Sequence, residues 1–173
     1  MQPALNYGLI AAFAMSVWTL LEYALGLHSS RVALGHYTTW GTQLIMLVVL
    51  WRLLLNQVRQ PHRFWLPLWE GLLLGLLTSV VAAMGLSLFG FLYLRFINPE
   101  YPYSVLEWKF AQLRAANVPE ENIRTMARSY LWSMGPVGLP VTLIGQHLLL
   151  ALVASPVLTL WLNWRHKEPA PTP

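Results

Sequence analysis

Ionisable side chains that could do chemistry are few in this sequence, and the most informative one lies within an apolar segment. Glu22 is close to the end of the first long apolar run. An ionisable group inside a membrane helix is costly and is often functional; a buried, unpaired Glu22 would have a raised pKa and could carry a proton. The favoured interpretation is structural, with Glu22 at a membrane interface and bonded to one of three side chains: Arg31, His36 or Gln43.

A second polar pair lies near the middle of the last apolar segment. Gln146 and His147 share a level with Thr78 and Ser79 of the third segment, which favours a hydrogen bond across a helical bundle. A proton relay or a cofactor ligand is the alternative for this pair. A lone histidine within a membrane lacks the partners that a metal or haem site needs, so we expect neither a metal nor a cofactor.

Taken together, these side chains allow a functional hypothesis. A polar track from the outer third of a membrane to its midplane could be lined by Glu22, Gln43, Gln146 and His147. Such a track would suit a small proton-coupled transporter or channel, which would have to be oligomeric because four helices leave little room for a pore. The alternative is that these side chains are paired inside a bundle.

Other kinds of chemistry find no support in the sequence. There is no cysteine, which excludes disulfides, thiolate metal sites and cysteine nucleophiles. Nucleophile-elbow, phosphate-loop, zinc-protease and dinucleotide-binding patterns are absent from the sequence as well. We therefore expect no catalytic residues and no enzyme activity.

The composition is typical of a protein with lipid as solvent. Of the 173 residues, 56% are hydrophobic and 10% are charged, whereas a soluble domain has about a quarter charged residues. The net charge of +4 suits contact with anionic headgroups. No basic run suggests nucleic acid binding.

Four apolar segments approach or exceed the roughly 20 residues that cross a bilayer. Their approximate bounds are 5–26, 36–55, 64–96 and 136–164. We predict an all-α integral membrane protein with four transmembrane helices. Residues 1–164 would form a single membrane domain, and residues 165–173 a proline-rich C-terminal tail.

The third segment is too long for a simple crossing, so one end should leave the membrane. Trp65 and Trp69 mark one interface, and Tyr93 with Arg95 marks the other.

A polar region at about 99–135 separates the third and fourth segments. Ser104 and Glu107 have the spacing of a capping box, which predicts the start of a helix. Pro119, Glu120 and Glu121 suit the first turn of a second helix. We predict a two-helix amphipathic insertion, lying on the membrane surface or covering the mouth of the bundle.

Small residues recur at every fourth position of the third segment, a spacing that lets two helices approach closely. The strip consists of Gly71, Gly75, Ser79, Ala83 and Ser87, and the first segment offers Gly8, Ala12 and Ser16. Packing within one chain is favoured over a dimer seam. We expect the first and third segments to touch.

Basic residues favour one end of the bundle as cytoplasmic. The short loop before the third segment carries Arg59 and Arg63, and the C-terminal tail adds Arg165 and Lys167. The opposite loop also has several arginines, mixed with glutamates. By the positive-inside rule, both termini are placed in the cytoplasm. At that headgroup boundary we predict ion pairs among Arg52, Arg63, Glu70 and Arg165.

Four stretches resemble a known family. They are Asn6-Tyr7-Gly8, Glu70-Gly71, Phe96-Ile97-Asn98-Pro99-Glu100-Tyr101, and the stretch from Leu113 to Ile123. The last is similar to a family pattern, Leu-x-Ala-x-Gly-x-x-x-Glu-Glu-Ile, with Asn117 in place of the glycine. Both residue types suit a helix C-cap. The chain thus resembles the bacterial membrane proteins called domain of unknown function 4199. That resemblance implies a four-span fold in a bacterial inner membrane, and no particular activity.

The favoured functional hypothesis is therefore a small non-catalytic accessory or scaffold subunit of the bacterial inner membrane. Its expected partners are the lipid bilayer and another membrane protein or a second copy of itself, and not nucleic acid.

Overall fold

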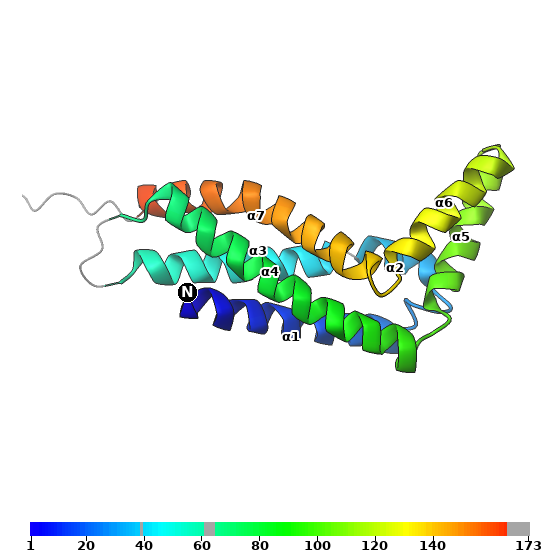
Figure 1. The fold of residues 1–173 in the computed structure, drawn as a ribbon, viewed down its shortest axis with the longest axis horizontal. Helices are drawn as coiled ribbons and strands as arrows, with labels where there is room; N and C mark the ends of the chain where they lie inside the picture. The colour runs from blue at the N-terminus through cyan, green and yellow to red at the C-terminus, as the bar shows by residue number, and fades with distance from the viewer. Residues whose placement is uncertain (39, 61–64, 166–173) are drawn as a thin grey trace, which may run out of the picture.

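The structure is a computed structural model that describes residues 1–38, 40–60 and 65–165, with only the backbone of His36. The proline-rich tail and Arg63 lie outside the described residues. Within these ranges every regular element is helical, and Figure 1 shows a long bundle with a two-helix projection at one end.

Four helical stretches are long and apolar enough to cross a membrane, as the sequence predicted. They are α1 (Gln2–Ala24), α2 with α3 (Val32–Thr38 and Trp40–Val58), α4 with a short π-helix η1 (Leu68–Leu92 and Tyr93–Ile97), and α7 (Gly138–Arg165). The bounds differ from the prediction by a few residues. Prolines set two of the starts, because α1 has Pro3 in its first turn and α4 has Pro67 as its N-cap.

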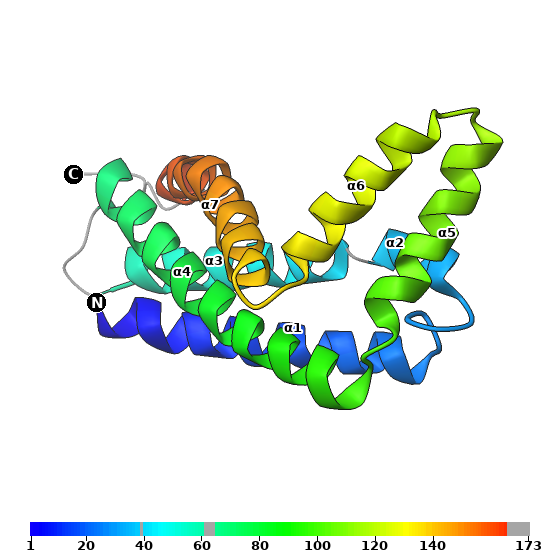
Figure 2. The same ribbon diagram turned by 45° about the vertical axis from the view of Figure 1, so that its right-hand side comes forward.

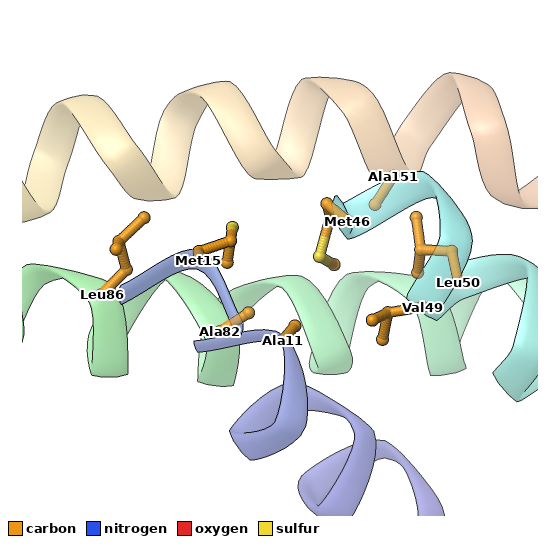
Figure 3. Packing of buried hydrophobic residues seen from close by; sticks show 8 residues of the cluster. All are labelled: Ala11, Met15, Met46, Val49, Leu50, Ala82, Leu86 and Ala151. Atoms are coloured by element: carbon orange, nitrogen blue, oxygen red, sulfur yellow. The ribbon is translucent and has the colours of Figure 1, made fainter. Parts of the chain in front are cut away.

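Helix α4 is the centre of the bundle and packs most extensively against α7 and α1. Helix α3 packs against α1 and α7. The main hydrophobic cluster lies where these helices meet (Figure 3), with side chains from all four of them: Ala11, Met15, Met46, Val49, Leu50, Ala82, Leu86 and Ala151.

Small residues allow α4 to approach both neighbours closely, but it uses two different faces. Gly71 faces Thr159 of α7, and Gly75 faces Ser155, whose Cβ lies 2.8 Å from where a Cβ on Gly75 would be. Toward α1, a Cβ on Gly8 would lie 2.7 Å from the Cβ of Val81. Helices α1 and α4 therefore touch as expected, while Gly71 and Gly75 of the predicted strip face α7.

The remaining members of the strip are placed as follows. Ala12 of α1 lies against Gly85 of α4, which is outside the strip. Ser79, Ala83 and Ser87 are buried. The hydroxyls of Ser16 and Ser87 donate to carbonyl oxygens one turn earlier in their own helices, at 2.8 Å and 2.6 Å.

Between η1 and α7 the chain forms α5 (Tyr101–Ala115) and α6 (Glu120–Ser133), an antiparallel pair that extends beyond the end of the bundle (Figure 2). The predicted capping box is wrong. Helix α5 begins three residues before Ser104, with Pro102 in its first turn, and the Ser104 hydroxyl donates back to the carbonyl oxygen of Glu100 at 3.2 Å.

The turn between α5 and α6 depends on Asn117. This residue has a φ of 56°, the left-handed conformation that favours glycine or asparagine after a helix. The amides of Asn117 and Val118 donate to the carbonyl oxygens of Arg114 and Leu113, each at 3.0 Å. Arg114 also makes two hydrogen bonds to Glu120, of 2.9 Å and 3.3 Å. The expected C-cap role of Asn117 is thus confirmed.

The close contact of α4 and α7 can be tested with Gly75→Ala. Because the new methyl group would overlap Ser155, we expect a loss of stability of about 1–3 kcal/mol, the usual cost of overpacking. The matched control is Gly145→Ala in α7, where an added Cβ meets nothing within 4 Å. Thermal unfolding followed by circular dichroism in detergent measures both. Equal unfolding temperatures for the two variants would contradict the close contact.

Candidate functional site

A tight turn after α1 brings His28 back to the side chain of Glu22. Gly26 follows the helix with a φ of 75°, and its amide donates to the carbonyl oxygen of Tyr23 at 2.9 Å. The amide of Leu27 donates to the carbonyl oxygen of Glu22, also at 2.9 Å. This is a Schellman motif, and it reverses the chain so that the side chain of His28 packs against Glu22 in the last turn of α1.

The π-helix at the end of α4 positions the other two members of the site. Tyr93 is its first residue, and the amide of Asn98 donates to the carbonyl oxygen of Tyr93 at 2.8 Å. Single π turns are often found at functional sites. Here the turn places the side chains of Tyr93 and Asn98 on the same side, toward His28.

Four buried side chains form one network at the end of the bundle from which α5 and α6 project. The Nε2 of His28 lies 3.5 Å from the Oε2 of Glu22, and its Nδ1 lies 2.6 Å from the hydroxyl of Tyr93. The Nδ2 of Asn98 donates to that hydroxyl at 3.1 Å and to the carbonyl oxygen of His28 at 3.4 Å. Residues about 65–70 positions apart in sequence are thereby joined.

A neutral His28 protonated on Nε2 satisfies every contact in this network. The Asn98 amide nitrogen donates to the Tyr93 oxygen, the Tyr93 hydroxyl donates to Nδ1 of His28, and the Nε2 proton is directed at Glu22. We predict this arrangement over the alternative in which Nδ1 donates to the second lone pair of the Tyr93 oxygen. Glu22 thus has one carboxylate oxygen facing an N–H group and a second, Oε1, that is buried without a hydrogen-bond partner.

Aromatic rings surround the network. The ring of Tyr101, from the first turn of α5, lies 4.3 Å from the ring of His28 between centroids. Phe89 and Tyr23 contact Tyr93 at centroid distances of 6.1 Å and 5.9 Å. Burial, with the nearby carboxylate of Glu22, raises the pKa of Tyr101 to about 12, so this phenol is neutral at physiological pH.

A pocket of about 180 Å³ opens beside Glu22. Its polar wall is formed by Glu22, His28, Thr19, Thr42, Gln43 and Gln146. Phe89, Tyr93 and Tyr101 contribute aromatic wall, and aliphatic side chains from α4 and α7 complete it. Three of the four polar residues singled out from the sequence therefore share one pocket.

His147 does not line this pocket. It is buried elsewhere in the bundle. Its Nδ1 donates to the carbonyl oxygen of Leu143, one turn earlier in the same helix, at 2.8 Å, and its Nε2 has no hydrogen-bond partner. The predicted hydrogen bond to Thr78 or Ser79 is wrong, since the hydroxyls of both residues are also buried without partners. One level further along α7, the hydroxyl of Ser155 is in the same state.

The carboxylate of Glu22 faces His28, which was not among its expected partners, rather than Arg31 or Gln43. The third expected partner, the side chain of His36, lies outside the described residues, so that alternative stays a prediction. Tyr93, predicted at an interface, is 2% exposed.

The ion pairs predicted at the other end stay a prediction, because Arg63 lies outside the described residues. Glu70 lies in the first turn of α4. The guanidinium groups of Arg52 and Arg165 lie over the rings of Trp51 and Trp161, at 5.8 Å and 5.2 Å from the ring centroids.

Sequence reasoning missed His28, Asn98 and Tyr101 as site residues. A signal for two of them was present, because Asn98 and Tyr101 belong to the stretch Phe96–Tyr101 that carries the family resemblance. His28 lies in a turn and has no periodic pattern to mark it. A metal centre has no candidate among the described residues, where no three His, Cys, Asp or Glu side chains gather.

The fold and this site define an all-helical protein with four helices able to cross a membrane by length and composition. The chain belongs to the family described as protein of unknown function (DUF4199), whose family model matches residues 6–163. No curated protein and no solved structure shows significant similarity to it.

The network can be tested with Tyr93→Phe, which removes only the hydroxyl. His28 and Asn98 would each lose a buried hydrogen bond, so we expect the free energy of unfolding to fall by about 1–3 kcal/mol. Tyr103→Phe on α5 is the matched control, because Tyr103 is 57% exposed. Thermal unfolding in the same detergent compares them. A Tyr93→Phe protein as stable as the control would show that the network is not formed.

Proposed function

We propose that the protein is a multi-pass protein of the bacterial cytoplasmic membrane with both termini in the cytoplasm. Four helices of sufficient length and hydropathy support membrane insertion. The start of α1, the end of α3, the start of α4 and the end of α7 lie at one end of the bundle, and α5 and α6 at the other (Figure 1). Arg52, Arg59 and Arg165 are at the first end, which supports its cytoplasmic placement.

Cysteine labelling tests this orientation, because the native chain has no cysteine to remove. Gln112 on α5 and Gln60 after α3 are both exposed, at opposite ends. In intact cells made permeable only at the outer membrane, we expect an impermeant maleimide to label Gln112→Cys and to spare Gln60→Cys until the inner membrane is opened. The reverse pattern would invert the topology.

For its activity we propose a non-catalytic accessory or scaffold subunit that binds another membrane protein through α5 and α6. The observation that carries this proposal is an apolar stripe on α6 that the chain covers only in part. Ile123 is 1% exposed, whereas Met126 is 54% exposed and Leu131 is 40% exposed. Large exposed apolar side chains on a polar element are typical of interaction surfaces.

The position and construction of the two helices support a protein partner over lipid. They extend beyond the end of the bundle rather than along its sides (Figures 1 and 2). The Arg114–Glu120 pair and the ammonium group of Lys109, 4.8 Å from the centre of the Tyr130 ring, hold them together. A preformed hairpin loses less conformational entropy on binding than a segment that must first fold, which favours its use as a docking element.

The test is native mass spectrometry after extraction of the tagged chain from its own membranes in mild detergent. We expect a stoichiometric second membrane protein. Met126→Glu together with Leu131→Glu should release it, because two charges would have to be buried in an apolar contact. Thr125→Glu, on the polar side of α6 beside Arg124 and Arg128, is the control and should keep the partner. A clean monomer, or equal release by the control, would contradict the proposal.

Proton-coupled transport by an oligomer stays a prediction from the sequence. Glu22, Gln43 and Gln146 share one pocket, which is favourable to it. His147 is not among the pocket's lining residues, so the structure adds no continuation of the track toward the middle of the bundle. The docking function therefore has the better support.

A further inference from the structure

The pocket beside Glu22 contains a hydrogen-bond acceptor to which none of the described residues donates. The side chain of Glu22 is 9% exposed, yet its Oε1 makes no hydrogen bond. A buried acceptor without a donor costs roughly 1–3 kcal/mol, and more when it is charged. Since Glu22 lines an open pocket, a cationic ligand that donates an N–H hydrogen bond to Oε1 would remove that cost.

The charge of the site is also uncompensated. With His28 neutral, as in the predicted hydrogen-bond arrangement, the Glu22–His28 pair carries the single negative charge of the carboxylate. Among the described residues, the pocket is lined by one carboxylate, that of Glu22, and by no lysine or arginine. The pocket therefore selects for a cation.

The walls indicate which kind of cation. Phe89, Tyr93 and Tyr101 line the pocket next to the carboxylate. Aromatic rings around a charged group are the typical environment of ammonium ligands, since the ring faces attract a diffuse positive charge. A divalent metal would need several anionic or imidazole ligands, and the described residues hold no group of three. Gln43 and Gln146 supply amide oxygens for further N–H donors.

We propose that this pocket is a binding site for an ammonium cation, with Glu22 as the counter-ion and Phe89, Tyr93 and Tyr101 as the aromatic wall. Its volume of about 180 Å³ holds about six water molecules at about 30 Å³ each, enough for a cation of a few heavy atoms. The same chemistry belongs to a free alkylamine and to the ethanolamine headgroup of a lipid. The proposal is independent of the docking function, because Met126 and Leu131, the exposed apolar side chains that carry that function, do not line the pocket.

The experiment uses the full chain, purified in an amine-free detergent, with ethanolamine, methylammonium and choline chlorides as probes. We expect each of at least two probes to raise the unfolding temperature in a saturable way, because the cation binds the folded state only. Sodium and potassium chloride at equal ionic strength are the comparison and should give no saturable rise. Equal rises with the inorganic salts, or no saturable rise with any ammonium probe, would overturn the proposal.

Two variants locate the effect. Glu22→Gln keeps the shape and removes the charge, so ammonium affinity should fall about tenfold or more, the usual value of a charge-assisted hydrogen bond. Glu107→Gln on the exposed side of α5 is the charge-matched control and should bind like the parent. If Glu22→Gln does not fold, Tyr101→Leu tests the wall instead and should weaken choline binding about threefold or more. Affinity unchanged in the folded variant would overturn the proposal.

A further experiment with lipids distinguishes a lipid headgroup from a soluble amine as the source of the ligand. Native mass spectra are recorded after exchange into mixed micelles with equal phosphatidylethanolamine and phosphatidylglycerol. Selective retention of the ethanolamine lipid by the parent and by Glu107→Gln, and not by Glu22→Gln, assigns the site to a lipid headgroup. Saturable binding of the free probes without that selectivity assigns it to a soluble amine. Loss of the docking partner in the α6 variants would leave both results unchanged.

Discussion

A carboxylate buried in an apolar bundle needs a donor, and this requirement connects the parts of the structure that lie farthest apart in sequence. Glu22 is held by His28, His28 by Tyr93, and Tyr93 by Asn98. The turn after α1, the π-helix after α4 and the first residues of α5 all meet at this chain of hydrogen bonds. An unpaired buried charge would cost several kcal/mol. The need to pair Glu22 therefore restricts how these three segments can pack at this end of the bundle.

Helix α4 connects this hydrogen-bonded site to the rest of the fold. Small residues let it approach α1 on one face and α7 on another, and the same helix ends in the π turn that carries Tyr93. At the other end of the bundle, the side chain of Asn163 in α7 bonds both the amide and the carbonyl of Leu66, at 3.0 Å and 2.8 Å, just before α4 begins. Both ends of α4 are thus fixed by buried side-chain bonds, while its middle is fixed by packing alone.

Features that depend on local interactions could be predicted from the sequence, whereas contacts between residues far apart in the sequence could not. Hydropathy and length predict the four long helices, because lipid imposes them segment by segment. Asn117 and the prolines mark the two short helices through local backbone chemistry. The capping box at Ser104 failed because Pro102 and Glu100 open the helix earlier, and two local signals competed. The partner of Glu22 could not be predicted, since His28 becomes its neighbour only through the Schellman turn at Gly26, and Tyr93 only through packing of α4 on α1. The hydrogen bond expected between His147 and Thr78 or Ser79 failed for a related reason: equal depth in the bundle does not fix which way two side chains face.

The state of His28 is the most direct test of this account. Nitrogen-15 NMR of histidine-labelled protein in nanodiscs at about pH 8, well above the ordinary histidine pKa of about 6.5, distinguishes the two neutral tautomers and the imidazolium. His28 is assigned by comparison with a His28→Gln sample. The expected result is a neutral ring protonated at Nε2, with Nδ1 shifted by the hydrogen bond from Tyr93 and the shift lost in Tyr93→Phe. A ring protonated at Nδ1, or an imidazolium at this pH, would contradict the hydrogen-bond directions on which the charge of the pocket depends.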